Sequence, residues 1–261
     1  MRFRQILLVL LCAGLLPACA SLPPGERDPR DPMERFNRSM YKFNDTLDRG
    51  VARPAAKAYV KVTPAPVRTG VSNFFRNLNS VTVIANNLLQ AKPRAFFTET
   101  ARLVVNTTIG IGGLFDPASQ FGIPAGDEDF GQTLGRWGVK SGPYIVLPVL
   151  GPSTVRDTVG LVGDQFTDPK YYLIDDFWVN AGLTVLSLVD SRAGLLGTDE
   201  VLASSFDPYV FMRNAYLQRR EFQVSDGRSS QQAEEFEIFE FDDEEFDEEP
   251  PAQTAADPAP Q

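Results

Sequence analysis

The spacing of apolar residues predicts a mainly helical protein. After an Asp-Pro pair at residues 31 and 32, apolar positions recur every three or four residues, which places them on one face of a helix. Asp31 fits the N-cap position and Glu34 follows three residues later, the pattern of a capping box, so we predict a helix that extends to about Leu47. Its apolar stripe comprises Met33, Phe36, Met40, Phe43 and Leu47.

The same periodicity predicts a series of helices along the rest of the chain. They cover a short segment ending near Tyr59, residues 67–90 with breaks, residues 96–107, residues 175–189 and residues 207–222. We expect Ser153 or Thr154 to cap one more short helix, which runs through Val159. Residues 144–149 have strand composition, but prolines on both sides disfavour a central strand, so we predict a short apolar hairpin. The expected fold class is mainly α, a compact set of short amphipathic helices.

The first residues carry a targeting signal rather than part of the fold. Two arginines precede an apolar run over residues 6–16, which is too short to cross a bilayer core of about 30 Å but has the length of a secretory signal. Residues 16–19, Leu-Pro-Ala-Cys, resemble a bacterial lipobox. We therefore expect removal of residues 1–18, lipidation of Cys19 and a flexible linker over residues 19–30. In lipoproteins of this kind the alanine after the cysteine implies the outer membrane. An ordinary signal peptide with an incidental cysteine is the alternative.

Composition excludes several classes of function. The 261 residues contain no histidine, which removes Ser-His-Asp and Cys-His catalysis and His-bearing metal sites, and we predict no catalytic residue, metal or cofactor. The formal net charge is −9, and residues 233–261 hold 12 acids and no base. Such a charge distribution does not suit nucleic-acid binding. We expect residues 226–261 to form a disordered acidic tail, whose interleaved phenylalanines raise a second hypothesis, recruitment of a basic periplasmic partner.

Glycine-rich and charged motifs are the next candidates for function. Residues 110–113, Gly-Ile-Gly-Gly, lack the Lys-Ser/Thr of a phosphate loop and predict a hinge or a tight helix-to-loop corner. The carboxylates of residues 127–129 fit a solvated loop better than a cation site. Arg156 and Asp157 follow the predicted hairpin, where a lipid path would need polar groups for a headgroup. A local salt bridge is the alternative for this pair.

Short blocks of sequence between residues 31 and 222 match a known family in order. They include Asp31-Pro32-x-Glu34-x-Phe36-Asn37-Arg38, Asn106-Thr107-Thr108-x-Gly110-x-Gly112-Gly113, Phe130-Gly131-Gln132-Thr133-Leu134-Gly135-x-Trp137-Gly138, Gly151-Pro152-Ser153-Thr154-x-Arg156-Asp157 and Asp207-Pro208-Tyr209. Together these blocks resemble the MlaA/VacJ lipoproteins.

The resemblance implies both an architecture and an activity. The architecture is a ring of helices over residues 31–225 with a central amphipathic channel, embedded in the periplasmic leaflet of the outer membrane and associated with trimeric porins. The activity is removal of mislocalised phospholipids from the outer leaflet through the channel, and their transfer to a soluble periplasmic carrier for return to the inner membrane. Candidate residues on the lipid path are Asn106, Arg156, Asp157 and Arg192. Candidate hinge or gate residues are Gly110, Gly112, Gly113, Gly138 and Gly142.

Two other functions are compatible with the sequence. The chain contains 19 phenylalanines, and Phe-rich helix faces suit a packed core as well as a lipid interface, although the lipid anchor favours the interface. A lipoprotein scaffold that binds porins without conducting lipid is the main alternative. A phospholipid hydrolase is disfavoured because the chain has neither histidine nor a Gly-x-Ser-x-Gly elbow.

Overall fold

A computed structural model describes residues 28–227, and it confirms the prediction of a mainly helical fold. The α-helices are α2 Glu34–Leu47, α3 Arg53–Val62, α4 Ala65–Leu89, α5 Pro93–Thr108, α6 Pro117–Gln120, α7 Phe130–Arg136, α8 Val155–Asp164, α9 Lys170–Leu173, α10 Phe177–Gly194, α11 Asp199–Ser204 and α12 Pro208–Val224. Two short strands, β1 Tyr144–Leu147 and β2 Gly151–Thr154, complete the described secondary structure, together with a π-helical turn, Asp48–Ala52, and a 3₁₀ turn, Leu196–Thr198. The expected signal peptide, Cys19 anchor and acidic tail lie outside the described residues.

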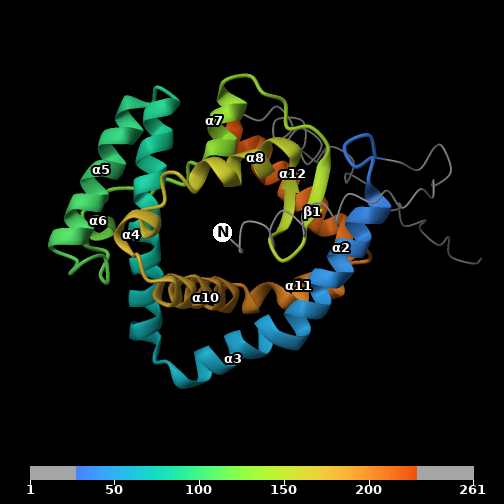
Figure 1. Ribbon diagram of the computed structural model, residues 1–261, viewed down its shortest axis with the longest axis horizontal. Helices are drawn as coiled ribbons and strands as arrows, with labels where there is room; N and C mark the ends of the chain where they lie inside the picture. Colours follow the sequence, from blue (N-terminus) through green and yellow to red (C-terminus); the bar gives the residue numbers. More distant parts are fainter. Residues whose placement is uncertain (1–27, 228–261) are drawn as a thin grey trace, which may run out of the picture.

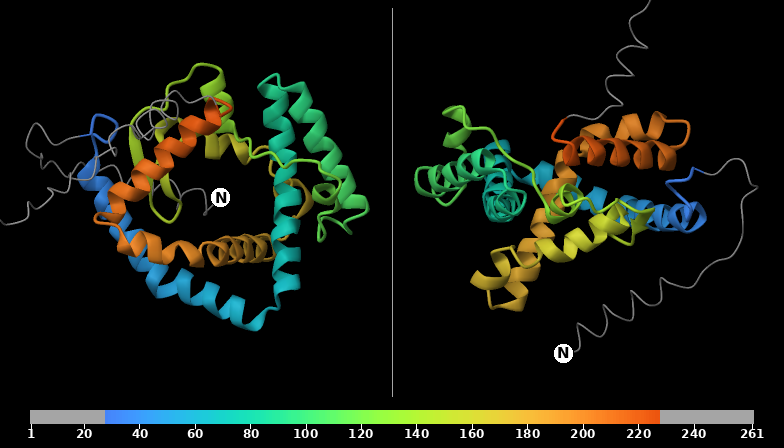
Figure 2. Two further views of the ribbon diagram at one scale, coloured as in Figure 1. Left: turned by 180° about the vertical axis from the view of Figure 1, so that it is seen from behind. Right: turned by 90° about the horizontal axis from the view of Figure 1, so that it is seen from above.

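The helices trace a ring (Figure 1). Helix α2 forms its right side, α3 its lower side and α4 its left side. Helices α7, α8 and α12 close the top, and α10 runs across the ring above α3. Helix α5 packs on the outside of α4, with α6 beside it. Seen edge-on in Figure 2, α12 lies on one face of the ring, and the segment around α9 and the start of α10 projects from the other face.

The first helices differ from the sequence prediction in how they begin and join. Helix α2 begins after Met33 and no side chain caps it, so the predicted capping role of Asp31 is wrong. Asp31 is instead buried and accepts a hydrogen bond from the Asn37 side chain at 2.7 Å and others from Tyr209 and Arg213 in α12. Helix α2 then continues through the π-helical turn into α3, and Pro54, which has no N–H to donate, lies in the first turn of α3.

Helix α4 runs unbroken for 25 residues, so the breaks predicted within residues 67–90 are wrong. Its prolines lie at or before the first turn, where the missing N–H costs no hydrogen bond, and Gly70 is its only internal glycine. Helix α5 likewise starts at Pro93, three residues before the predicted start.

Side-chain caps define the starts of several later helices. The Thr154 hydroxyl accepts the Asp157 N–H at 3.2 Å and caps α8, as predicted, although this helix continues past Val159 to Asp164. Asp176 caps α10 through the Val179 N–H at 2.8 Å. Asp207 caps α12, which is the helix predicted over residues 207–222.

The predicted hairpin is present. Strands β1 and β2 are antiparallel, with Tyr144 opposite Thr154 and Leu147 opposite Gly151. Asn37 from α2 holds this hairpin, because its amide donates to the Tyr144 carbonyl at 3.0 Å and its oxygen accepts the Val146 N–H at 2.9 Å. The small apolar core of Tyr144, Val146 and Tyr209 therefore forms where α2, β1 and α12 meet.

Candidate functional site: a polar interior beneath an apolar surface

The buried residues of this protein are mainly polar. Among residues 28–227, eighteen buried residues are polar or charged and only six are hydrophobic. The buried faces of the long helix α4 illustrate this, since they comprise Asn77, Ser80, Thr82, Val83, Asn86 and Asn87. In an ordinary water-soluble domain the fully buried residues are mostly aliphatic or aromatic. The interior of this ring is therefore built on hydrogen bonds rather than on an apolar core.

The surface shows the opposite bias. None of the phenylalanines in the described residues is buried, and Phe166, Phe177 and Trp178 are 72%, 56% and 79% exposed. The exposed aromatic and aliphatic side chains around α9 and the start of α10 also include Tyr171, Tyr172, Leu173 and Val179. Contiguous apolar patches of this kind mark surfaces that contact lipid or another protein. None of the helices within residues 28–227 is both long enough and apolar enough to cross a membrane.

Arg156 and Asp157 belong to a buried ion network that joins α7, α8 and α12. The Arg156 guanidinium donates to Asp157 Oδ1 from two nitrogens, at 3.0 and 2.9 Å. Arg220 from α12 contacts Asp157 at 2.8 Å and Asp129, at the start of α7, at 2.6 Å. The Tyr216 hydroxyl donates to the other Asp157 oxygen at 2.8 Å. The local salt bridge considered for the Arg-Asp pair is therefore present, as part of a larger network.

Ion pairing in this network overrides the effect of burial on its carboxylates. Burial by itself raises the pKa of Asp157, but the hydrogen bonds and charge of Arg220 lower that pKa below its usual value. The same balance lowers the pKa of Asp129. Burial lowers the pKa of Arg220, and its two carboxylate partners raise it further than burial lowers it. The network is therefore ionised at neutral pH and holds three helices together by charge-assisted hydrogen bonds.

Arg192 belongs to a second ion cluster, where α10 and α11 meet the end of α2. Its guanidinium forms a bidentate pair with Asp48, at 2.6 and 2.9 Å, and contacts Asp199 at 2.8 Å. Arg53 lies 3.3 Å from the same Asp199. The hydrogen bond from Arg192 lowers the pKa of Asp48. This cluster attaches the inner helix α10 to the outer side of the ring.

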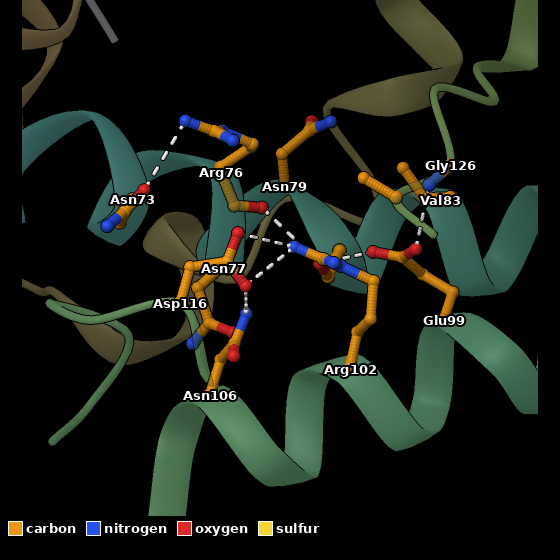
Figure 3. Close-up of a pocket in the computed structure, with 12 residues that line it drawn as sticks. Asn73, Arg76, Asn77, Asn79, Val83, Glu99, Arg102, Asn106, Asp116 and Gly126 are labelled. Carbon is orange, nitrogen blue, oxygen red and sulfur yellow. Dashed lines mark hydrogen bonds and ion pairs between the residues drawn. The ribbon is translucent and has the colours of Figure 1, made fainter. Parts of the chain in front are cut away.

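Asn106 lies in a third polar cluster, between α4, α5 and the loop after α5. Its amide donates to Asp116 at 2.9 Å, and its oxygen accepts the Ala118 N–H at 3.0 Å. Arg102, one turn earlier in α5, contacts both Asp116 oxygens at 2.9 Å. Burial raises the pKa of Asp116, and hydrogen bonds from Ser119, Asn106 and Arg102 outweigh it, so this pKa is lowered. The cluster borders a small polar pocket between the two helices (Figure 3).

The glycines after α5 form a tight corner. Gly110 leaves no room for a side chain, because a Cβ there would lie 2.4 Å from the backbone oxygens of Asn106 and Phe115. Gly112 and Gly113 adopt left-handed φ values of 67° and 89°, which glycine tolerates best. Backbone hydrogen bonds from the N–H groups of Gly112 and Gly113 to the last turn of α5, both at 2.9 Å, fix the corner. Of the hinge and the corner that the sequence predicted, the arrangement fits the corner.

Gly138 and Gly142 flank the segment between α7 and β1. Both have left-handed φ values, 89° and 68°. A Cβ at Gly138 would meet no atom within 4 Å, whereas one at Gly142 would lie 3.2 Å from Val155. The neighbouring Trp137 and Val139 are exposed apolar residues. A gate at this segment stays a prediction.

The carboxylates of residues 127–129 do not form a free acidic loop. Asp127 accepts a hydrogen bond from Gln223 at 2.7 Å, Glu128 pairs with Lys92 at 2.8 Å, and Asp129 pairs with Arg220. The segment is a loop, as expected, and Asp127 is exposed, but Glu128 and Asp129 are partly buried and each of the three carboxylates has its own partner. No group of three potential metal ligands occurs within residues 28–227.

The structure divides the four candidate lipid-path residues among three clusters. Arg156 and Asp157 lie together, while Asn106 and Arg192 each belong to a separate cluster. Arg220 is not among the residues predicted from the sequence, although it follows Arg213 and Tyr216 at helical spacing along α12. Polar residues at that spacing along a helix, in a chain rich in apolar residues, indicate that the helix buries a polar face.

Comparison with known proteins agrees with this geometry. Residues 29–223 match the sequence profile of the family described as MlaA lipoprotein. The chain is 38% identical over 218 residues to the intermembrane phospholipid transport system lipoprotein MlaA of Escherichia coli K12, an alignment that covers 82% of this chain and 86% of the relative. It is 36% identical over 234 residues to the protein of the same description from Haemophilus influenzae, an alignment that covers 87% of this chain and 93% of the relative.

A solved structure supports the same assignment. It comes from work on the structural basis for maintenance of bacterial outer membrane lipid asymmetry, and its sequence is 38% identical to this chain. The two folds superpose with a TM-score of 0.68 over 76% of this chain and all of the solved one. By sequence and by structure, the chain belongs to the MlaA lipoprotein family.

Proposed function

We propose that this protein is an outer-membrane lipoprotein that maintains lipid asymmetry. In this proposal it takes mislocalised phospholipids from the outer leaflet, passes them through an amphipathic channel in the helical ring, and delivers them to a soluble periplasmic carrier for return to the inner membrane. The names of its relatives, an intermembrane phospholipid transport system lipoprotein in two organisms, support the substrate class. Association with a trimeric porin, and lipidation at Cys19, are further parts of the proposal.

The observation that carries the proposal is the reversed distribution of polar and apolar residues. Moving a large apolar side chain out of water is favourable by about 1.5–3 kcal/mol. Exposed side chains such as Phe166, Leu173 and Trp178 would forgo this free energy if they lay in water. In a lipid leaflet these side chains are solvated by acyl chains instead. Short helices that lie within one leaflet need no bilayer-spanning length, which agrees with the helices observed.

The edge-on view supports an orientation. The aromatic segment around α9 and the start of α10 projects from one face of the ring, and α12 lies on the other (Figure 2). Tyr171 and Tyr172 are of a residue type that favours the boundary between hydrocarbon and headgroups. We therefore place the α9–α10 face in the leaflet and the α12 face toward the periplasm, where a carrier approaches.

Polar residues inside the ring complete the proposed path. A migrating phospholipid carries a charged headgroup, and an unpaired charge in hydrocarbon costs several kcal/mol, so its passage requires a polar lining. In this proposal the ion clusters around Asp157 on α8 and Arg192 on α10 supply this polar lining. The chain has no ATP-binding motif, so the direction of transfer must come from the partners.

The test is to measure surface-exposed phospholipid in cells that lack the protein, with an amine-reactive reagent that does not cross the membrane. Deletion should increase labelling of aminophospholipids, and the wild-type gene should restore the original level. An unchanged level in the deletion strain would refute the transport function.

Complementation with variants separates the channel from the scaffold alternative. The Arg156→Gln/Asp157→Asn double variant should fail to restore asymmetry at normal abundance, whereas Arg219→Gln, an exposed residue on α12, should restore it. Full restoration by the double variant would remove this pair from the lipid path. A porin-bound protein whose absence leaves asymmetry intact would support the scaffold.

A further inference from the structure

The pocket between α4 and α5 holds two charged groups, Arg76 and Glu99, that have no oppositely charged partner among the residues that the structure describes. Its lining comes from one face of α4, one face of α5, and the loop that follows α5. Figure 3 shows Glu99, Arg102 and Asn106 rising from α5 toward α4, with Arg76 and Asn79 on α4. Arg76 and Asn79 are exposed and Glu99 is buried, so the pocket runs from a mouth at Arg76 to an interior at Glu99.

Glu99, in the interior of the pocket, has no cationic partner among residues 28–227. Glu99 is 3% exposed, and it accepts hydrogen bonds from the Ser80 hydroxyl at 2.5 Å and the Gly126 N–H at 2.9 Å. Within residues 28–227, no lysine or arginine nitrogen lies within 4.0 Å of its carboxylate. The neighbouring Arg102 is already paired with Asp116. A buried carboxylate without a counter-ion is unusual and favours a cationic ligand.

The interior also has a hydrogen-bond acceptor without a donor. The Asn77 side chain is 92% buried, and its amide donates to the Thr107 hydroxyl at 3.0 Å. Its oxygen Oδ1 is buried and accepts no hydrogen bond from the described residues. An unsatisfied buried acceptor costs about 1–3 kcal/mol, which a bound N–H or O–H donor would recover.

At the mouth of the pocket, Arg76 has no anionic partner among the described residues. The Arg76 guanidinium is exposed, and its one hydrogen bond to the described residues goes to the Asn73 oxygen at a long 3.3 Å. Its remaining donors are free to bind a phosphate in the fork geometry that arginine favours. The pocket thus offers a cation at its mouth and an anion at its base.

We propose that this pocket binds the zwitterionic headgroup of an ethanolamine phospholipid, with the phosphate on Arg76 and the ammonium group inside, near Asn77 and Glu99. This inference rests on the proposed lipid-transport function and adds a headgroup preference to it. The enclosed space is about 20 Å³, enough for one water-sized group. An ammonium group has that size, whereas the trimethylammonium group of choline does not enter. The site therefore selects ethanolamine over choline.

The test is calorimetric titration of the full chain in detergent with two short-chain lipids, dihexanoyl phosphatidylethanolamine and dihexanoyl phosphatidylcholine. The wild type should bind the ethanolamine lipid at least about tenfold more tightly, the effect of one charge-assisted contact. Inorganic phosphate should bind more weakly than the ethanolamine lipid. Equal binding of the two lipids, binding of neither, or phosphate binding as tight as the lipid would overturn the assignment; binding of neither is the result for a pocket filled by water.

Two variants divide the site into its halves. Arg76→Gln removes the phosphate partner and should weaken the binding of both lipids about tenfold. The fold should stay intact, because Arg76 is exposed and its guanidinium makes one long hydrogen bond to the described residues. Glu99→Gln keeps the size of the side chain and should weaken only the ethanolamine lipid, so the preference over choline falls. Arg94→Gln, at an exposed residue of α5 outside the pocket, is the matched control. If Arg76→Gln behaves like Arg94→Gln, the site is not there.

Failure of the headgroup site can be distinguished from failure of the proposed function. Should deletion of the gene expose phospholipid while Arg76→Gln binds lipid like the wild type, only the headgroup site fails. Should deletion have no effect while the ethanolamine preference is observed and depends on Arg76, the transport function fails and the lipid site stands.

Discussion

Arg220 connects α12 to the rest of the ring through hydrogen bonds to two carboxylates. It donates to Asp157 at 3.1 and 2.8 Å and to Asp129 at 2.6 and 3.0 Å. Its side chain is only 11% exposed. Methionine at this position fills similar volume but leaves both carboxylates without this partner. We therefore expect Arg220→Met to loosen α12 and to lower the stability of the whole ring.

The size of this effect follows from what remains around the two carboxylates. Removing one partner of a buried ion pair costs about 3–5 kcal/mol. Asp157 keeps Arg156 and Tyr216, and Asp129 is one-third exposed, so the loss belongs at the lower end, about 3 kcal/mol. For a folded domain of this size each kcal/mol shifts the thermal midpoint by about 2–4 °C, which predicts a decrease of about 6–12 °C.

The assay is thermal unfolding of the full chain in detergent, followed by far-UV circular dichroism at neutral pH. Arg219→Met, the exposed neighbour on α12, is the matched control and should change the midpoint by less than about 2 °C. The Arg220→Met/Asp157→Asn double variant should lose less than the sum of its single variants, because both act on one contact. If Arg220→Met unfolds at the same temperature as Arg219→Met, the ion network does not hold the ring together.

Other features of the structure give predictions of similar kind. Gly110→Ala should lower the thermal midpoint markedly, because its Cβ would collide with two backbone oxygens, whereas Gly182→Ala in α10, with nothing within 4 Å, should leave it unchanged or raise it. Burial raises the pKa of Asp164 to about 6, and its unfolded value is about 3.9, so the folded state binds this proton more tightly and loses stability as pH rises through that interval. Asp164→Asn should therefore raise the midpoint at about pH 7 and not at about pH 4, and an equal gain at both would contradict this. Arg192→Met, which leaves Asp48 without its bidentate partner, should speed limited proteolysis around α11, and an unchanged cleavage pattern would show that this cluster does not attach α10 to the ring.

Much of the fold was predictable from sequence because local signals and the final structure agree. Asp207 caps α12, at the start of the helix predicted over residues 207–222, and the prolines around residues 144–149 confine the strands to a short hairpin. Asp31 was predicted to do the same at α2 and does not, because Tyr209 and Arg213 offer it better hydrogen-bond partners. Those partners lie far along the chain, and local sequence carries no trace of them.

The polar interior was harder to predict. Apolar periodicity located the longer helices but did not show which face of each is buried. In α5 the charged residues Glu99 and Arg102 are buried, while Val104 is 54% exposed. In water the opposite arrangement would be favoured, so the usual assignment of apolar stripes to the core fails for α5. For the same reason the candidate lipid-path residues proved to be spread over three ion and hydrogen-bond clusters.

The central claim is that the exposed apolar side chains lie in lipid hydrocarbon. Trp178 tests it most directly, because it is 79% exposed and belongs to the first turn of α10. The measurement is tryptophan fluorescence of the full chain reconstituted in vesicles with and without brominated acyl chains, compared with Trp178→Phe, which leaves only Trp137. We predict blue-shifted emission that brominated lipid quenches strongly in the wild type, and a large loss of that quenching in the variant. Emission typical of water, with no quenching by brominated lipid, would contradict the account.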